Sequence, residues 1–395
     1  MIFQTLDDKS ECVGVYTDGK LSFDEIPENL TKTWKYSASI KDDKVEYAWI
    51  RCGGLSLQQV CPAELKEELD LVQSEFKAYL TAFRIAKIDL SELCFYDLVP
   101  ENFLLQFCEV KNKITAYVFE NYDKSESYDH LSKVHKLLHK IKHKSLNVNN
   151  TNCVDLMVRS MDREKIKKLL NGSHFINYNL FGTITGRLAT HPGSFPVLTM
   201  NKKYRKLIKP HNDWFLSLDY NGAEVRTALA LGGHEQPDYD IHEWNMHNIF
   251  ADCEVDREEA KVRFFAWLYN PKTEFSTDSV YNKDVILRKY YKNGFLETPF
   301  GRNIAVDRGR AFAYLNQSTT ADITLDRAAE IDYILHDRDS FVSHVVHDEV
   351  VVDLKDKERD LVPMIKSVYE NTILGKYKVN LKAGENYSDL KELII

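Results

Sequence analysis

The chain contains 395 residues, which is longer than one typical domain, so we expect two or three packed units. A hydrophobic fraction of 44% and a charged fraction of 28% are ordinary for a soluble globular protein. The net charge of −8 argues mildly against a general nucleic-acid binder, although net charge does not locate charged patches.

The sequence carries no signal for membrane insertion or export. Its longest apolar stretches fall far short of the roughly 20 residues that a membrane helix needs. The first residues, MIFQTLDDKS, lack the basic region and apolar core of a secretory signal. The 7 cysteines are scattered and form no CxxC pair, which indicates reduced, buried thiols rather than a disulfide framework or a zinc site. We therefore expect a cytoplasmic protein without a membrane partner.

Residues 1–88 mix strand and helix signals. GVYTDGKLSF (14–23) alternates apolar and polar residues about an Asp-Gly pair, which predicts a hairpin. KVEYAWIRCGG (44–54) predicts another strand that ends in a Gly-Gly turn. Residues 61–87 predict one amphipathic helix opened by a proline. Together these signals indicate a small α+β module.

Residues 89–172 have mostly helical periodicity and include a strongly basic stretch. KVHKLLHKIKHK (133–144) holds five lysines and three histidines without an acid, and NKKYRKLIKP (201–210) adds five more positive charges. Either stretch alone is typical of a solvated helix face. Two of them in an otherwise acidic chain also suit a track for a phosphate backbone, and the sequence leaves both interpretations open.

Two predicted strands place acids where the chain turns. WFLSLDY (214–220) brings Asp219 to its end, and a helical pattern follows at 223–233. SHVVHDEVVVDL (343–354) predicts a valine-rich hairpin with His347, Asp348 and Glu349 at its turn. Unpaired buried charges cost several kcal/mol, so these carboxylates require a cation. If the two strands are adjacent, Asp219 and Asp348 meet, and two Mg²⁺ ions about 3.5–4 Å apart would satisfy both and support displacement at phosphorus.

A predicted helix at 256–270, DREEAKVRFFAWLYN, repeats functional side chains every four residues. Arg257, Lys261, Phe265 and Tyr269 would form one stripe on it. An ordinary amphipathic helix with contacts between successive turns explains this pattern. Two cations followed by two flat rings also suit the triphosphate and the base of a nucleotide.

These segments together resemble the family-A DNA polymerases, the bacterial DNA polymerase I type shared by many phage replication enzymes. The family's Asp-Tyr-x-x-x-Glu-x-Arg motif is matched by DYNGAEVR, its Arg-x₃-Lys-x₃-Phe/Tyr-x₃-Tyr helix by the stripe, and its His-Asp-Glu hairpin by HDE. Weaker matches in family order are TITGRLATHP (183–192), DIH (240–242), TPFGR (298–302), NQSTTADI (316–323) and GENYSDL (384–390). The resemblance covers residues from about 90 to 395 and is greatest to a compact phage enzyme that lacks an exonuclease domain.

The resemblance implies an α+β fold shaped like a right hand. The palm, with an antiparallel sheet, would span 173–395, and the short helical fingers would lie at about 235–297. The helical thumb would span 89–172, beside the small N-terminal α+β module at 1–88. The stretch between Tyr269 and Thr298 is shorter than in the bacterial enzymes, so we expect trimmed fingers.

The resemblance also implies the catalytic residues. Asp219 and Asp348 would hold two Mg²⁺ ions, with the Tyr220 carbonyl as a further ligand and Glu349 as an occasional ligand or a neighbour of the ligands. Arg257 and Lys261 would clamp the triphosphate, and Lys261 would donate a proton to pyrophosphate.

Other residues would contact the sugar, the base and the DNA. Phe265 would stack near the sugar and base, and Tyr269 would close on the nascent pair. Glu224 would exclude a 2′-hydroxyl, with an ion pair to Arg226 as its alternative role. The remaining resemblance-implied DNA contacts are Arg187 and Gln317 on the minor-groove side and His347 near the primer terminus.

Two positions in the first motif depart from the family pattern. Asn221 stands where the family usually has Ser and Gly222 where it usually has Gln, so we expect one template-side contact to be lost. Residues 1–100 contain no Asp-x-Glu of a proofreading exonuclease, so we expect no 3′→5′ proofreading. Residues 1–88 would be either an exonuclease remnant or a docking surface for a separate exonuclease or processivity subunit.

The resemblance thus implies a template-directed DNA polymerase that adds dNTPs to a primer 3′-hydroxyl on primer–template DNA, in the host cytoplasm if a phage encodes it. A single-subunit RNA polymerase is an alternative, against which Glu224 and the short chain speak. A non-catalytic scaffold that binds primer–template is another. Retention of Asp219 and Asp348 beside Lys261 speaks against the scaffold.

Overall fold

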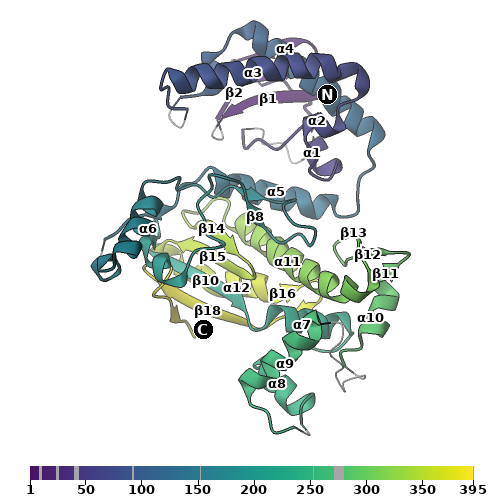
Figure 1. The fold of residues 1–395 in the computed structure, drawn as a ribbon, viewed down its shortest axis with the longest axis vertical. Coiled ribbons are helices and arrows are strands. Elements are labelled where there is room, and N and C mark those ends of the chain that lie inside the picture. The colour runs from purple at the N-terminus through teal and green to yellow at the C-terminus, as the bar shows by residue number, and fades with distance from the viewer. Residues whose placement is uncertain are drawn as a thin grey trace. The chain divides into compact units, whose positions relative to one another are not determined.

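The structure, a computed structural model, describes residues 1–8, 11–23, 26–39, 44–90, 93–151, 153–251, 253–270 and 280–394. The chain divides into two compact units, Met1–His143 and Lys144–Ile395, each of which is described by itself (Figure 1). Within the described ranges, no helix is both long enough and apolar enough to cross a membrane.

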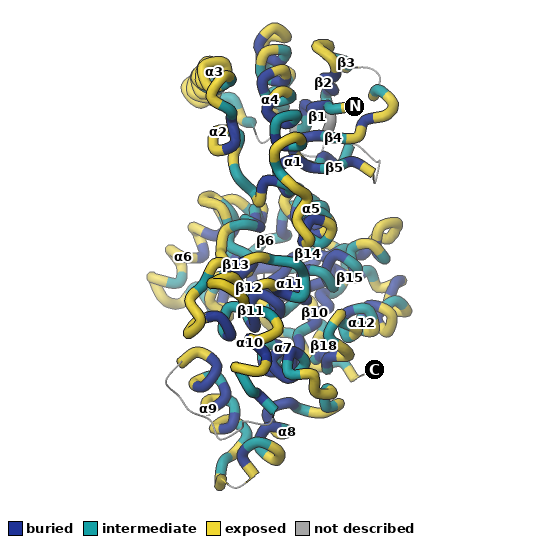
Figure 2. Tube along the Cα trace, turned by 90° about the vertical axis from the view of Figure 1, so that its right-hand side faces the viewer, coloured by how far each residue is buried: buried dark blue, intermediate teal, exposed yellow. Residues whose placement is uncertain are grey.

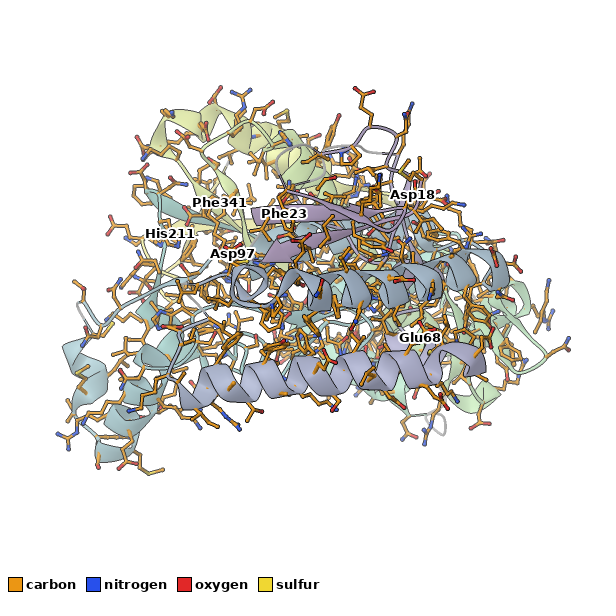
Figure 3. The ribbon with its side chains drawn as sticks, turned by 90° about the horizontal axis from the view of Figure 1, so that it is seen from above. Asp18, Phe23, Glu68, Asp97, His211 and Phe341 are labelled. Atoms are coloured by element: carbon orange, nitrogen blue, oxygen red, sulfur yellow. The ribbon has the colours of Figure 1, made fainter. Side chains whose placement is uncertain are left out.

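The first unit begins with an antiparallel sheet of three strands in the order β1-β2-β3. The strands are β1 (Phe3–Asp8), β2 (Glu11–Thr17) and β3 (Lys20–Ser22). The turn between β2 and β3 consists of Asp18 and Gly19, which have φ values of 46° and 80° (Asp18 is labelled in Figure 3). Asp and Gly tolerate this left-handed conformation, so the hairpin predicted from the Asp-Gly pair is confirmed.

The strand predicted at 44–54 is wrong over most of its length. Only β5 (Glu46–Tyr47) is extended, where it pairs in parallel with β4 (Lys32–Thr33), and the chain then turns into α1 (Ala48–Arg51). Ala48 and Ile50 are both buried by this single helical turn. A short apolar run fits a buried strand and a buried helical turn equally well, so periodicity does not distinguish them.

The helices of the first unit share one apolar core with its strands. The long helices are α3 (Lys66–Ile85), α4 (Glu101–Asn121) and α5 (Tyr128–Lys142), and α2 (Leu57–Val60) is a single turn. Leu6 and Tyr16 of the sheet belong to the same buried cluster as Val72 of α3 and Ile114 of α4. The outer face of α3 is exposed (Figure 2), and Glu68 on it accepts a hydrogen bond of 3.1 Å from Lys113 of α4 (Figure 3). The predicted helix at 61–87 is thus confirmed from residue 66 onward.

The second unit is built on a five-stranded antiparallel sheet in the order β14-β15-β10-β18-β19. Its strands are β10 (Trp214–Tyr220), β14 (Phe341–Val346), β15 (Glu349–Leu354), β18 (Val379–Gly384) and β19 (Lys391–Glu392). The central strand β10 pairs with β15 on one side and with β18 on the other. Both predicted strands at 214–220 and in the valine hairpin are therefore confirmed, and they are neighbours.

Residue alternation along β10 gives the sheet two different faces. The Tyr220 ring stacks on Tyr369 of α12 (Val362–Glu370) with centroids 4.3 Å apart, and its hydroxyl donates to the Tyr369 carbonyl at 2.7 Å. Helix α12 therefore covers the face that carries Tyr220. Successive side chains of a strand point to opposite faces, so Asp219 lies on the other face.

The segment between β10 and β14 is mainly helical. Its helices are α7 (Ala223–Leu231), α8 (Ile241–Asn248), α9 (Arg257–Tyr269), α10 (Lys283–Tyr290) and the long α11 (Arg308–Ile334). Side chains from α7, α9 and α11, including Val225, Phe264 and Phe312, form one buried cluster. The helices predicted at 223–233 and 256–270 are confirmed.

Short elements complete the second unit. They are β6 (Asn147–Val148), α6 (Ser160–Leu170), β7 (Tyr178–Asn179), β8 (Ala189–Thr190), β9 (Ile208–Lys209), β11 (Tyr291–Lys292), β12 (Phe295–Glu297), β13 (Asn303–Ala305), β16 (Asn371–Thr372) and β17 (Gly375–Lys376). The division between the units falls after His143, inside the stretch 89–172 expected to form a thumb. The assignment of that stretch, of the module at 1–88 and of the fingers stays a prediction.

Candidate active site

Two carboxylates lie at one end of the central sheet. Asp219 is the penultimate residue of β10 and pairs across strands with Glu349, the first residue of β15. Asp348 precedes Glu349 in the tight turn, where His347 adopts a left-handed φ of 58°. The predicted juxtaposition of the two strand ends is therefore present.

The electrostatics of these acids show that they share one site. Burial, followed by the negative charges of Asp348 and Glu349, raises the pKa of Asp219 to about 7. Burial also raises the pKa of Asp348 above its usual value. Like charges in a poorly hydrated site favour protonation unless a cation is bound, so the pair is a natural cation site.

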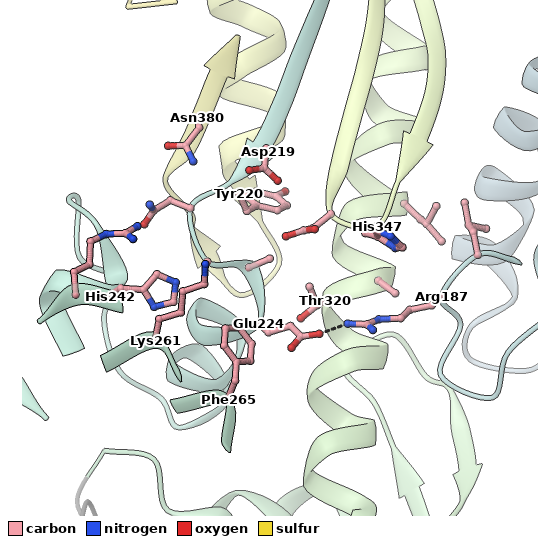
Figure 4. A pocket seen from close by; sticks show the side chains of 18 residues that line it. Arg187, Asp219, Tyr220, Glu224, His242, Lys261, Phe265, Thr320, His347 and Asn380 are labelled. Atoms are coloured by element: carbon pink, nitrogen blue, oxygen red, sulfur yellow. Dashed lines mark hydrogen bonds and ion pairs between the residues drawn. The ribbon is translucent and has the colours of Figure 1, made fainter. Parts of the chain in front are cut away.

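A cavity of about 540 Å³ opens beside these acids (Figure 4). Its walls bring together residues from distant parts of the sequence. The predicted site residues that line it are Arg187, Asp219, Tyr220, Glu224, Arg257, Lys261, Phe265, His347 and Asp348. The predicted site residues Glu349, Tyr269 and Gln317 are outside its lining.

The Glu349 carboxylate is held by two hydroxyl groups and a guanidinium group. Its carboxylate accepts hydrogen bonds from the hydroxyls of Ser217 at 2.6 Å and Tyr387 at 2.7 Å. The Arg205 guanidinium lies 3.8 Å from the same carboxylate. Tyr387 comes from the GENYSDL stretch and Arg205 from the NKKYRKLIKP stretch, so both segments fix the Glu349 side chain next to Asp219 and Asp348.

Glu224, in the first turn of α7, contacts Arg187 and Tyr269. Its carboxylate accepts hydrogen bonds from the Arg187 guanidinium and the Tyr269 hydroxyl, and Tyr269 also hydrogen-bonds to Gln317. Burial raises the pKa of Glu224, and burial with the bond to Glu224 raises the pKa of Tyr269 to about 12. These contacts connect α7, α9 and α11 at the edge of the cavity.

The alternative role of Glu224 as a partner of Arg226 is wrong. The Arg226 side chain is completely buried and donates to the carbonyl of Asn221 at 2.8 Å and of Tyr239 at 2.7 Å. Arg226 points away from Glu224 because side chains two residues apart on a helix do not face each other. The sequence could not show that Glu224 would instead meet Arg187, which lies 37 residues away along the chain.

Three weak sequence matches converge beside Arg187. Gly186 has a φ of 75°, and a side chain there would lie 2.6 Å from the Arg302 guanidinium carbon. Arg302 in turn donates two hydrogen bonds, of 2.6 and 2.8 Å, to the fully buried carboxylate of Asp322 on α11. The stretches TITGR, TPFGR and NQSTTADI therefore meet around one buried ion pair, next to the arginine that reaches Glu224.

The predicted stripe lies on α9 as expected, because the helix buries its opposite face, which includes Phe264 and Trp267. The Phe265 and Tyr269 rings are stacked with an interplanar angle of 8°. Lys261 has no ion-pair partner in the part of the chain that the structure describes. Arg257, by contrast, is bound to the Asp240 carboxylate through hydrogen bonds of 2.7 and 3.2 Å.

Sequence reasoning assigned no role to several residues around the cavity. His242 lines it, and burial lowers the pKa of its ring to about 4. Asn380 of β18 lies opposite Asp219 in the sheet and also lines the cavity. Only the strand pairing reveals Asn380, whereas His242 stood within the DIH match and could have been singled out there.

Asn221 and Gly222 organise the turn between β10 and α7. The Asn221 side chain accepts from the backbone N–H of Ile241 at 2.9 Å and donates to Asp240 at 2.8 Å. Gly222 has a φ of 67°, and a Cβ there would lie 2.5 Å from an Ile241 methyl group. A Gln at position 222 would thus be strained, so this departure from the family pattern follows from the local packing.

The acids suit a Mg²⁺ ion that keeps water and phosphate ligands, rather than a metal ion held by protein side chains alone. Within the described residues, no group of three His, Cys, Asp or Glu side chains gathers that could hold a metal alone. Mg²⁺ usually takes one or two carboxylates and completes its shell with water and substrate phosphates. The half-buried pair Asp219 and Asp348, open to a cavity with Lys261 and Arg257 in its walls, fits that pattern.

Comparison with known proteins is informative for the fold. No family model matches the sequence, and no curated protein matches it. The structure is similar to the polymerase domain of Pol1 from M. smegmatis, solved in complex with a DNA primer-template and dNTP. The TM-score is 0.55 at 14% sequence identity, over 73% of this chain and 76% of that one. The chain therefore has the α+β, right-hand fold of a DNA polymerase domain, as the sequence predicted.

Proposed function

We propose that the chain is a template-directed DNA polymerase of family A that adds dNTPs to a primer 3′-hydroxyl by two-metal phosphoryl transfer. The observation that carries the proposal is one cavity with two faces of opposite charge: the half-buried acids Asp219 and Asp348, and the cations Lys261 and Arg257. A site that transfers a phosphoryl group needs both, because it must hold metal ions and a polyphosphate together.

The residues of the acid face would hold the metal ions. Asp219 and Asp348 supply the carboxylates, the Tyr220 carbonyl supplies a further oxygen, and Glu349 acts as an occasional ligand or supports the pair. When bound, the two Mg²⁺ ions would lower the pKa of the primer hydroxyl and neutralise charge on the leaving pyrophosphate.

The residues of the cationic face would bind the nucleotide. Lys261 is the better proton donor to pyrophosphate, because Arg257 is already occupied by Asp240. Such cations stabilise charge where it develops in the transition state. Phe265 would stack near the sugar and base, and Tyr269 would close on the new pair.

Four further residues would contact and select the substrates. Glu224, fixed between Arg187 and Tyr269, would exclude a 2′-hydroxyl. Arg187 and Gln317 would contact the minor-groove side of the primer–template end, and His347 would lie near the primer terminus. These contacts test shape more than sequence, because A·T and G·C pairs both offer acceptors there.

The remaining parts of the proposal concern the rest of the chain. Residues 89–172 would form the thumb, and the palm at 173–395 would carry short fingers at about 235–297. The chain would act in the cytoplasm (the host's, if a phage encodes it) without 3′→5′ proofreading. Residues 1–88 would be an exonuclease remnant or would dock a separate exonuclease or processivity subunit.

Primer extension on a short primed template with Mg²⁺ tests the proposal directly. Template-directed addition of dNTPs, lost in Asp219→Ala, is the expected result. Addition of NTPs in preference to dNTPs would favour a single-subunit RNA polymerase. Tight binding of the duplex without addition by the wild-type protein would favour a non-catalytic scaffold and would contradict the proposal.

A further inference from the structure

A second charged cluster, of the opposite sign, lies in the first unit. The Lys35 ammonium lies 4.0 Å from the centroid of the Trp49 ring, and that ring lies 4.8 Å from the His135 ring. Next to it, the Tyr36 and His139 rings are 5.1 Å apart. We call the following residues the basic cluster: Lys35, Lys111, His135, His139 and Lys142, with the rings of Tyr36 and Trp49.

The lysines of the basic cluster repel one another. Lys35 reaches solvent but is closely surrounded by protein, and burial followed by the charges of Lys111 and Lys142 lowers its pKa to about 8. Burial lowers the pKa of Lys111 as well. In the described ranges of the chain, none of these three lysines forms an ion pair with an acid. The fold therefore gathers positive charge without internal compensation.

His135 supplies an independent observation, a buried nitrogen atom without a hydrogen-bond partner among the described residues. The Nε2 atom of His135 is buried and has no hydrogen-bond partner among the described residues. Burial, followed by neighbouring positive charges, lowers the pKa of His135 to about 3, so its ring is neutral at physiological pH. A buried polar atom without a partner costs roughly 1–3 kcal/mol, so such an atom points to a ligand that completes it.

We propose that the basic cluster is a site for the phosphate groups of single-stranded nucleic acid. Phosphate oxygens would pair with the Lys35, Lys111 and Lys142 ammonium groups, and a base would take the place over the Trp49 ring that the Lys35 ammonium leaves when it turns to a phosphate. A bare anion would use the lysines alone, whereas cations interleaved with flat rings match a strand of nucleotides. The site lies wholly in the first unit and is additional to the proposed polymerase site.

Chemical labelling locates the site on the full-length chain. Acetic anhydride at about pH 8 modifies lysines of lowered pKa readily, because more of their amines are uncharged. An oligo-dT of about 12 nucleotides should reduce acetylation of Lys35 and Lys111 severalfold, measured by mass spectrometry of peptides. Lys77, exposed on α3, should be modified equally with and without the oligonucleotide.

A matched pair of double variants measures the contribution to affinity. Lys35→Gln with Lys142→Gln should weaken oligo-dT binding about tenfold at low salt and make the logarithmic salt slope less negative by about 1.4, from two lost phosphate contacts. The control, Lys20→Gln with Lys77→Gln, removes two exposed lysines of the same unit and should bind as the wild type does.

The competing ligands and the chemistry separate the outcomes. Protection by pyrophosphate as strong as that by oligo-dT would show that the lysines alone bind a bare anion and would overturn the proposal of a site for a nucleic-acid strand. Protection by polyglutamate but not by oligo-dT, unchanged labelling with either, or equal weakening in both double variants would overturn the proposal. Single-nucleotide addition by the first double variant should be unchanged, so loss of the site and failure of the polymerase function remain distinct results.

Discussion

The two units each hold a cluster of like charges, and the clusters differ in how they are built. In the second unit, Asp219 and Asp348 stand at the ends of paired strands, where the register of β10 and β15 fixes them. In the first unit, Lys35 precedes the α1 turn, Lys111 lies on α4 and His135 lies on α5, so the basic cluster joins a loop and several helices.

In both clusters, the pKa shifts favour the neutral form of the side chains. Burial and repulsion raise the pKa of Asp219 to about 7 and lower that of Lys35 to about 8. Repulsion between like charges destabilises the unliganded protein, and a bound ligand of opposite charge is expected to restore that stability. The acid cluster thus predicts a cation and the basic cluster predicts an anion, and the acid cluster faces a cavity whose walls also carry Lys261 and Arg257.

The largest effect should come from removing one acid. Asp348→Asn should reduce primer extension by at least about 1,000-fold, because the remaining carboxylate cannot hold both metal ions. Affinity for primer–template DNA should change by less than about threefold, since phosphate contacts supply most of it. The exposed Asp360→Asn should extend primers normally. A large loss of DNA affinity in Asp348→Asn would indicate a structural role instead.

The cation opposite the acids should matter next. Lys261→Met should lower kcat for dNTP addition by about 100-fold, the lower end of what a general acid contributes. Arg263→Met is the control, because Arg263 lies on the same helix but pairs with Glu259 at the surface. Equal losses in both variants, measured by single-turnover kinetics, would mean that α9 had simply been destabilised.

The proposed sugar gate should show a smaller, selective effect. Glu224→Ala should raise the efficiency of ribonucleotide addition on the order of 100-fold, because the pocket gains room for a 2′-hydroxyl. Efficiency for dNTPs should fall less. Glu243→Ala, at an exposed position on α8, should leave the ratio unchanged. An unchanged dNTP/NTP ratio in Glu224→Ala would remove Glu224 from this role.

The smallest effects should appear in stability, and the two clusters should respond to pH in opposite senses. The raised pKa of Asp219 stabilises the metal-free protein at low pH, and that stability is lost as pH rises from about 4 through about 7. The lowered pKa of Lys35 stabilises it above about pH 10, and that stability is lost as pH falls through about 8.

Thermal unfolding in the presence of a chelator measures these contributions. At about pH 8, Asp219→Asn should raise Tm by a few degrees, whereas at about pH 4 it should have no such effect. Added Mg²⁺ should stabilise the wild type more at about pH 8 than at about pH 6, because protonation competes with the metal. A lower Tm of Asp219→Asn at both pH values would contradict the repulsion between Asp219 and Asp348.

The sequence by itself determined the parts of the site that are local in the chain. The run WFLSLDY predicts a strand that ends in an acid, and four-residue spacing places Lys261 and Phe265 on one helix face. These features follow from the periods of strands and helices, which depend on backbone geometry alone. The resemblance of the motifs, in their order, to those of the family-A DNA polymerases then predicts the fold class without any knowledge of tertiary contacts.

Only the tertiary structure decided which side chains meet. It placed Glu224 on Arg187 rather than Arg226, bound Arg257 to Asp240, and brought Asn380 beside Asp219 through strand pairing. It also made a helical turn of Ala48–Arg51, where a strand was predicted. Contacts between distant segments depend on packing and burial, which no local pattern encodes. For the same reason, the sequence could not show that His135 of the basic stretch at 133–144 packs against Trp49, which in turn lies under Lys35.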